Sequence, residues 1–324
     1  MRRAVLCLGL LMPSCKKRSQ VWRHTFALFT TLAAASGLAC AATIDEVLSQ
    51  DPPYDAQYPA AVVELSIPSG GARMPAHMYL ASGPGPHPTV VFLHGLPGNE
   101  RNLDIAQALR RFGFNTLYFH YRGAWGAEGE YRFSQLPEDV LAVLGFLRQG
   151  EQAASLRVDT QALSVLGHSL GGYAALASGA RDTQLRCVMA LSPANLGLWQ
   201  ADLKQGGGAT SDRLKAYADV LFMLRGFTGE RLEEELAFGA PGLWDTRGFG
   251  PGLQGKSVLM MVGEQDDVTP RLTMFDPVVA AYEQSGGIDL TARVITGDHS
   301  FSWSRLQLTR EILAWSDAHC RGRR

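Results

Sequence analysis

The stretch Leu163-Ser164-Val165-Leu166-Gly167-His168-Ser169-Leu170-Gly171-Gly172-Tyr173-Ala174-Ala175-Leu176 decides how this chain is expected to fold. Residues of strand character run into a Gly-x-Ser-x-Gly pattern, and small residues of helical character follow. This order predicts a nucleophile elbow, a sharp strand-to-helix corner that lifts the Ser169 hydroxyl above the sheet. Gly167 and Gly171 remove side chains that would collide with the neighbouring strand and helix. A plain Gly-Ser-Gly turn fits the same five residues, so the rest of the chain has to decide.

The composition is typical of a globular protein. The 324 residues are 46% hydrophobic and 19% charged, which suits one domain with a sizeable core. Residues 1–41 contain six Lys or Arg and no Asp or Glu, so the remainder has 24 basic residues against 31 acidic ones. An acidic body without a basic cluster argues against a nucleic-acid partner, because such binding depends on neutralising phosphates.

The N-terminal segment has the layout of a secretory signal peptide. Its basic start precedes an apolar run at 26–35 and small residues at 36–42, with a cleavage site near Ala41. We therefore predict a signal peptide over 1–41 and an exported protein, periplasmic or secreted. The apolar run is too short for a comfortable membrane span, so no stable span is expected after cleavage. An uncleaved anchor and a lipoprotein box ending at Cys40 are the alternatives.

Cleavage there would leave two of the five cysteines, Cys187 and Cys320. A disulfide scaffold is thereby excluded, although one bridge between the two is possible in an oxidising compartment. A small buried thiol at Cys187 is the alternative, because that residue lies in an apolar strand-like run. The chain has no Cys/His spacing of the zinc type, and we expect neither a metal nor a cofactor.

Predicted strands alternate with predicted helices along most of the chain. The strands are expected at 62–67, 76–80, 89–93, 115–119, 163–166, 187–191, 257–262 and 290–295, and the helices at 102–111, 136–148, after Ser169, at 271–284 and at 303–318. This alternation predicts an α/β fold with a mostly parallel, twisted sheet of about eight strands and helices on both faces. Between about 193 and 255 the alternation stops. We interpret that segment as a helical cap inserted between strands six and seven of a single domain, residues 42–324.

The predicted ends of the last two strands carry the groups that a serine nucleophile needs. A histidine must take the serine proton, and a carboxylate must hold that histidine. Asp266 follows strand 257–262, and His299 follows strand 290–295. The order Ser169, Asp266, His299 is the one expected after a nucleophile elbow, so we predict these three as the catalytic residues. Asp267 is the alternative acid.

The oxyanion that forms during acyl transfer needs backbone N–H donors. Leu170 directly follows the nucleophile and supplies one. The second is expected in the loop after strand 89–93, where Pro97 has no N–H, and we therefore choose Leu96. Two nearby histidines receive structural interpretations: His94 braces this loop by hydrogen bonding, and His168 has a packing role.

With these motifs in place, the chain resembles the α/β-hydrolases that carry a cap between the sixth and seventh strands. The resemblance spans nearly all of residues 60–320 and is carried by His94-Gly95, the elbow 167–171, the acid turn 263–270 and Gly297-Asp298-His299. It implies acyl transfer to water, as in esterases, lipases, thioesterases and serine peptidases. The branches with an aspartate at the elbow, haloalkane dehalogenases and epoxide hydrolases, are excluded by Ser169.

The segment 119–130 resembles a loop of bacterial hydrolases grouped with prolyl-oligopeptidase and aminopeptidase kinds of peptidase, although a fold does not fix a function. We interpret Arg122 as bracing this loop through hydrogen bonds to carbonyls. An aminopeptidase would also need a carboxylate that binds the substrate amine. Glu128, Glu130 and the run 233–235 are candidates, and nothing in the sequence singles one out.

The cap supplies seven large apolar residues that either line an acyl pocket or attach the cap to the body: Trp199, Phe222, Met223, Phe227, Phe238, Trp244 and Phe249. The expected function is that of an exported serine hydrolase that cleaves a small carboxylic ester through an acyl-enzyme. A serine peptidase acting on short peptides with the same triad is the alternative. A catalytically inactive binding module is a third hypothesis, and the sequence does not indicate an oligomeric state.

Overall fold

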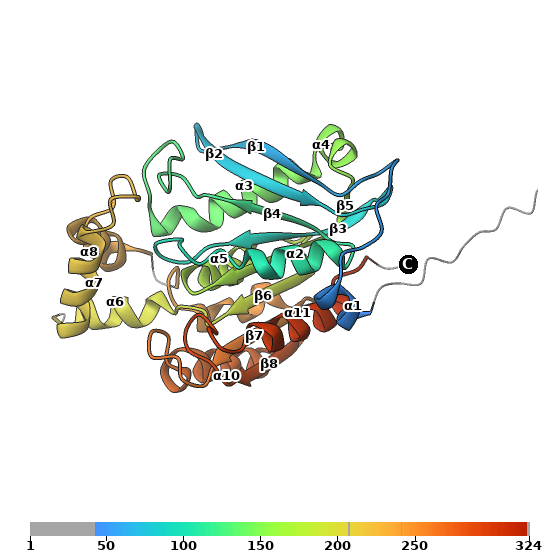
Figure 1. The fold of residues 1–324 in the computed structure, drawn as a ribbon. Coiled ribbons are helices and arrows are strands. Elements are labelled where there is room, and N and C mark those ends of the chain that lie inside the picture. The colour runs from blue at the N-terminus through green and yellow to red at the C-terminus, as the bar shows by residue number, and fades with distance from the viewer. Residues whose placement is uncertain (1–42, 207, 241, 323–324) are drawn as a thin grey trace, which may run out of the picture. The chain divides into compact units, whose positions relative to one another are not determined.

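The computed structural model describes residues 43–206, 208–240 and 242–322, so the predicted signal peptide at 1–41 lies outside the described residues. The described strands form one sheet of eight in the order β1-β2-β4-β3-β5-β6-β7-β8 (Figure 1). Strand β2 is antiparallel to β1 and β4, and all other neighbours are parallel. The strands are β1 (Ala61–Ser69), β2 (Ala72–Leu80), β3 (His87–Leu93), β4 (Asn115–Phe119), β5 (Val158–His168), β6 (Cys187–Leu191), β7 (Ser257–Gly263) and β8 (Asp289–Ile295). The predicted α/β fold is confirmed.

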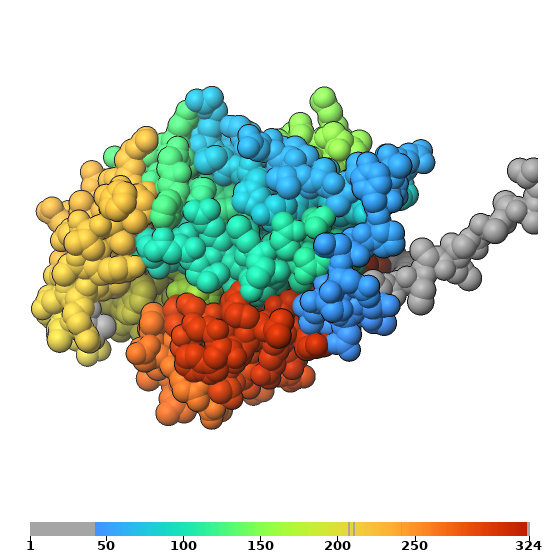
Figure 2. Space-filling view, in the orientation of Figure 1, coloured from blue at the N-terminus to red at the C-terminus, as the bar shows by residue number. Residues whose placement is uncertain are grey.

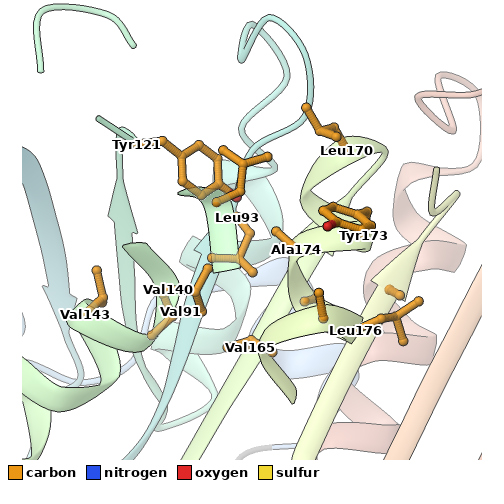
Figure 3. Close-up of a cluster of buried hydrophobic side chains, with 14 of the residues drawn as sticks. Val91, Leu93, Tyr121, Val140, Val143, Val165, Leu170, Tyr173, Ala174 and Leu176 are labelled. Carbon is orange, nitrogen blue, oxygen red and sulfur yellow. The ribbon is translucent and has the colours of Figure 1, made fainter. Parts of the chain in front are cut away.

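Helices cover both faces of the sheet. One face packs against α1 (Ile44–Ser49), α2 (Leu103–Arg111) and α11 (Arg305–His319), and the other against α3 (Leu136–Arg148), α5 (Leu170–Arg181) and α10 (Asp276–Ser285), which follows the π-turn Arg271–Phe275. A short helix, α4 (Gly150–Ser155), precedes β5. Successive side chains of a strand point to opposite faces. Phe92 therefore packs with α2 and α11, whereas Val91 and Leu93 pack with Val140 and Leu176 in the cluster of Figure 3.

Three helices lie between β6 and β7: α6 (Leu196–Lys204), α7 (Ala209–Asp219) and α8 (Gly229–Phe238). They gather at one end of the sheet, whereas α1 lies at the other end (Figures 1 and 2). The following turn Thr246–Phe249 and the short helix α9 (Gly250–Leu253) return to the body, where the Tyr282 hydroxyl donates a hydrogen bond to the Thr246 carbonyl at 2.9 Å. All of these elements lie within the expected insertion at about 193–255.

The loop after β4 holds these inserted helices. The backbone N–H of Trp125 donates to Met223 O at 2.9 Å, and that of Arg225 donates to Gly123 O at 2.8 Å. Further along, the Glu235 carboxylate of α8 accepts the backbone N–H of Ser134 at 2.7 Å. The loop that resembles the peptidases thus serves here as the attachment point of the cap helices.

Arg122 braces the same loop, but its predicted partners are wrong. Its Nε and backbone N–H both donate to the Asp139 carboxylate on α3, and its Nη2 donates to Glu138 at 3.1 Å. Arg122 and Asp139 are both buried. A buried guanidinium is stabilised far better by a carboxylate than by a neutral carbonyl, which explains why α3 supplies the partners.

A disulfide joins Cys187 in β6 to Cys320 at the end of α11, with 5.7 Å between the two Cα atoms. The sequence leaves open a disulfide or a free buried thiol at Cys187, and the structure shows the disulfide. Both cysteines are buried. Along the described ranges, no helix combines the length and the apolar character that crossing a membrane requires.

We predict that replacing Cys187 and Cys320 together by Ser lowers the free energy of unfolding by about 2–5 kcal/mol, because the bridge closes a sequence separation of 133 residues in the unfolded chain. Urea unfolding of the mature protein with and without a reductant measures this. The reductant should destabilise the wild type and leave the double variant unaffected. Equal stabilities of the two oxidised proteins would contradict the prediction.

Candidate active site

Ser169 lies at the corner between β5 and α5, as the sequence predicts. Its backbone has φ 59° and ψ −121°, a region that costs energy for a residue with a side chain. A Cβ on Gly167 would lie 1.9 Å from Gly171 O, and a Cβ on Gly171 would lie 2.1 Å from Leu93 O. Neither position accepts any other residue without moving the backbone, so the two glycines are required by the corner itself.

The structure brings Asp266 and His299 together beyond the ends of β7 and β8. His299 Nδ1 lies 2.9 Å and 3.0 Å from the two carboxylate oxygens of Asp266. The Asp266 side chain is fully buried, whereas that of His299 is 16% exposed. Asp267, the alternative acid, is exposed and is not a partner of His299 in the described part of the chain. The geometry therefore selects Asp266.

Thr269 fixes the Asp266 carboxylate, and sequence reasoning missed it. Its N–H and its hydroxyl both donate to Asp266 at 2.8 Å, and the Val268 N–H donates at 3.0 Å. Burial raises the pKa of Asp266, but the hydrogen bond and charge of His299 and the Thr269 N–H outweigh burial and lower that pKa to about 2. The Asp-x-x-Thr spacing of a side-chain-capped turn was the available signal.

His168 does more than pack. Its buried ring donates from Nε2 to the backbone carbonyl of His299 at 2.7 Å, and the centroids of the two rings lie 4.7 Å apart. Burial and the nearby His299 lower the pKa of His168 to about 4, so this ring is neutral at pH 7. The sequence predicts only a packing role because the partner is 131 residues away.

The predicted oxyanion donors come from two neighbouring segments. Leu170 is the first residue of α5, where an N–H has no partner within the helix, and Leu96 belongs to the loop after β3. His94 braces that loop as expected: its ring is buried, with Nδ1 2.8 Å from Gly95 O, and burial lowers its pKa to about 4. Trp125 also supports the loop by donating from Nε1 to Pro97 O at 2.7 Å.

A cavity of about 170 Å³ opens at Ser169. Its lining residues are Gly95, Leu96, Pro97, Gly98, Asn99, Glu100, His168, Ser169, His299 and Ser300. None of them comes from α6, α7 or α8. Of the large apolar residues around the cap, Phe227 and Trp244 are buried in the core, and Phe222 and Phe238 are exposed. These four do not line the cavity.

Most of the carboxylates considered for amine binding have other partners. Glu128 pairs with Arg73, Glu130 with Arg132, Glu233 with Lys215, and Glu235 with the backbone at Phe133 and Ser134. Glu234 is exposed on α8. None of the five lines the cavity at Ser169. Within the described ranges, no three His, Cys, Asp or Glu side chains are arranged so that they could hold a metal ion.

We predict that the stability difference between the wild type and Asp266→Asn depends on pH. The folded-state pKa of Asp266, about 2, lies below the ordinary value near 4. Its charge therefore stabilises the fold by about 2 kcal/mol at neutral pH, and roughly half of that is lost by pH 3. Unfolding by urea at pH 7 and pH 3 measures the difference, with the exposed neighbour Asp267→Asn as control. A difference that is the same at both pH values would refute this assignment.

Comparisons with known proteins bear on the family of this chain. Residues 90–308 match the model of the alpha/beta hydrolase family. The chain is 31% identical over 139 residues to 2,6-dihydropseudooxynicotine hydrolase of Paenarthrobacter nicotinovorans, which covers 41% of this chain and 35% of that protein. Its matches to curated relatives span between 24% and 45% of their lengths.

Two solved structures show the same fold. The crystal structure of a 2,6-dihydroxy-pseudo-oxynicotine hydrolase superposes with a TM-score of 0.59 at 22% identity and covers 82% of this chain and 71% of that one. Est1E from Butyrivibrio proteoclasticus superposes with a TM-score of 0.54 at 16% identity and covers 79% and 98%. The family match takes in β3, the elbow, β7 and His299, so the chain belongs to the alpha/beta hydrolase family.

Proposed function

We propose that this protein is an exported serine hydrolase that cleaves a carboxylic ester through Ser169, His299 and Asp266. One observation carries the proposal: Ser169, on a strained corner, opens into the same cavity as His299, and the Nδ1 atom of His299 is held by a buried carboxylate. A serine, a histidine and a carboxylate in this arrangement are the parts of an acyl-transfer site.

The geometry suggests the following chemistry. With the Nδ1 proton of His299 directed at Asp266, Nε2 is free to take the proton of Ser169 as its oxygen attacks the ester carbonyl. The oxyanion then accepts hydrogen bonds from the N–H groups of Leu96 and Leu170. The C–O bond to the alcohol breaks, and the alcohol leaves with the proton from His299. Water, deprotonated by the same histidine, attacks the acyl-enzyme, releases the acid and returns the proton to Ser169.

The low pKa of Asp266 suits this role. A carboxylate that stays ionised can balance the imidazolium that forms on His299 in each half of the reaction. Thr269 keeps the carboxylate in place through two hydrogen bonds. His168 supports the backbone of His299 through its carbonyl. We assign both Thr269 and His168 as positioning residues, because neither supplies an atom to the proposed bond changes.

Ester is preferred to amide as the substrate because four of the five carboxylates that were candidates for binding a peptide amine are already engaged elsewhere, and none lines the cavity. A serine peptidase with the same triad is the second candidate. The solved structures of this fold include both an esterase, Pf2001 of Pyrococcus furiosus, and a putative dipeptidyl aminopeptidase IV of Bacteroides ovatus. The export part of the proposal is supported by the Cys187–Cys320 disulfide, because such bridges persist mainly in oxidising compartments.

We predict that Ser169→Ala lowers the kcat of the mature protein for p-nitrophenyl esters by about 10³-fold or more, because the nucleophile is lost while the donors of the oxyanion site remain. A fluorophosphonate probe should label the wild type and fail to label the variant. Circular dichroism checks that the variant is folded. Unimpaired hydrolysis by Ser169→Ala would refute the whole assignment, and absence of labelling in the wild type would favour an inactive binding module.

We also predict that p-nitrophenyl esters are turned over faster than aminoacyl and prolyl p-nitroanilides. None of the five carboxylates that the sequence offers for binding a peptide amine lines the cavity at Ser169. Comparison of kcat/KM across ester chain lengths and these amides measures the preference. Amide turnover far above ester turnover would make the peptidase the better assignment.

A further inference from the structure

The wall of the cavity at Ser169 carries a single acidic side chain among its lining residues, that of Glu100. Glu100 lies in the loop after β3, just before α2, and is half-buried. Its Oε1 atom accepts the backbone N–H of Asn102 at 2.7 Å. That hydrogen bond restrains the carboxylate beside Asn102, the residue that precedes α2.

Two arginines near this loop contact groups other than the Glu100 carboxylate. The guanidinium of Arg101 lies over the rings of Tyr118 and Trp125, 5.6 Å and 5.5 Å from their centroids. Arg305 donates to Asp104 and to the side-chain oxygen of Asn102. In the described part of the chain Glu100 takes part in no ion pair. Its charge is therefore not cancelled by a contact within the protein.

The remaining lining residues add little positive charge to the wall. His168 is neutral at pH 7, and the other lining residues apart from His299 are glycines, Leu96, Pro97, Asn99, Ser169 and Ser300. His299 faces the buried carboxylate of Asp266. Glu100 is therefore the one carboxylate that a substrate meets among the residues that line this cavity. In a partly desolvated cavity such a charge attracts a cation and repels an anion more strongly than in bulk water.

We propose that Glu100 recognises a positively charged group of the substrate, an ammonium or a quaternary amine, and makes the site prefer cationic esters over neutral or anionic ones. This inference rests on the proposed ester hydrolysis and adds a substrate class to it. The carboxylates considered from the sequence lie after β4 or on α8, whereas Glu100 follows the predicted oxyanion donor Leu96 by four positions. Because Glu100 and Ser169 line the same cavity, a substrate there can contact both.

The test uses two pairs of esters that differ only in charge. The first pair is the p-nitrophenyl ester of γ-trimethylammoniobutyric acid and its carbon isostere, with a quaternary carbon in place of the nitrogen. The second pair, butyrylcholine and its carbon isostere, carries the charge in the leaving group. We expect kcat/KM to be about fivefold or more higher for the cationic member of at least one pair. The pair that shows the effect identifies the side of Ser169 that Glu100 faces.

The variant Glu100→Gln separates charge from structure, because its side-chain carbonyl can still accept the Asn102 N–H. We expect it to bring the ratio of kcat/KM for the cationic ester to that for its neutral isostere down to about one. Glu283→Gln, on the exposed face of α10, is the matched control and should keep the preference. The preference should also weaken as ionic strength rises.

Equal kcat/KM values within both pairs for the wild type, or the same preference in Glu100→Gln, would overturn the inference while leaving ester hydrolysis intact. Failure of the proposed function looks different, since no ester would then be turned over in a Ser169-dependent way. In that case, the rates at which Ser169 reacts with a cationic phosphonate and with its carbon isostere make the same comparison. Equal rates there would also overturn the inference.

Discussion

Helix α5 can lie against the ends of β3 and β5 only because Gly167 and Gly171 have no side chains, and the rest of the site depends on that close approach. A Cβ on Gly171 would lie 2.1 Å from Leu93 O, and a Cβ on Gly95 would lie 2.9 Å from the Cβ of Ser169. These missing atoms let the start of α5 and the loop after β3 meet. The proposed nucleophile and both proposed oxyanion donors, Leu96 and Leu170, come from the two segments that this contact joins.

The same corner also fixes the proposed base. His168 precedes Ser169, and its ring donates to the backbone carbonyl of His299. The ring of His299 contacts the Asp266 carboxylate through Nδ1, and Thr269 in turn donates to that carboxylate. Ser169 itself is held by hydrogen bonds from its N–H to Leu191 O and from the Ala194 N–H to its carbonyl. The positive φ of Ser169 costs of the order of 1–3 kcal/mol. Hydrogen bonds on both sides of the residue hold its backbone in this conformation.

The parts that the sequence predicts well are those with a local signal. The bounds of β4, β6 and α3 match the prediction. The two strands are apolar runs that end at turn residues, and α3 is marked by Pro137 in its first turn. The positions of Ser169, Asp266 and His299 follow from strand ends. Apart from Thr269, whose spacing from Asp266 is a local signal, what was missed depends on distant partners. These features are the carboxylates that bind Arg122, the carbonyl that binds His168, and α6, whose residues pack on α8. Such contacts have no periodicity that a single chain could display.

Trp125 connects the segment between α7 and α8 to the loop after β3. The backbone N–H of Trp125 donates to Met223 O next to the cap, and its indole Nε1 donates to Pro97 O in the loop that carries Leu96 and Glu100. The Gly98 position leaves no room for a Cβ, which would lie 2.9 Å from that indole nitrogen. Any shift of the segment around Met223 must therefore be absorbed by Trp125 or passed to the oxyanion loop. The segment around Met223 is thus linked through Trp125 to the loop that carries Leu96, even though none of the residues lining the cavity at Ser169 comes from α6, α7 or α8.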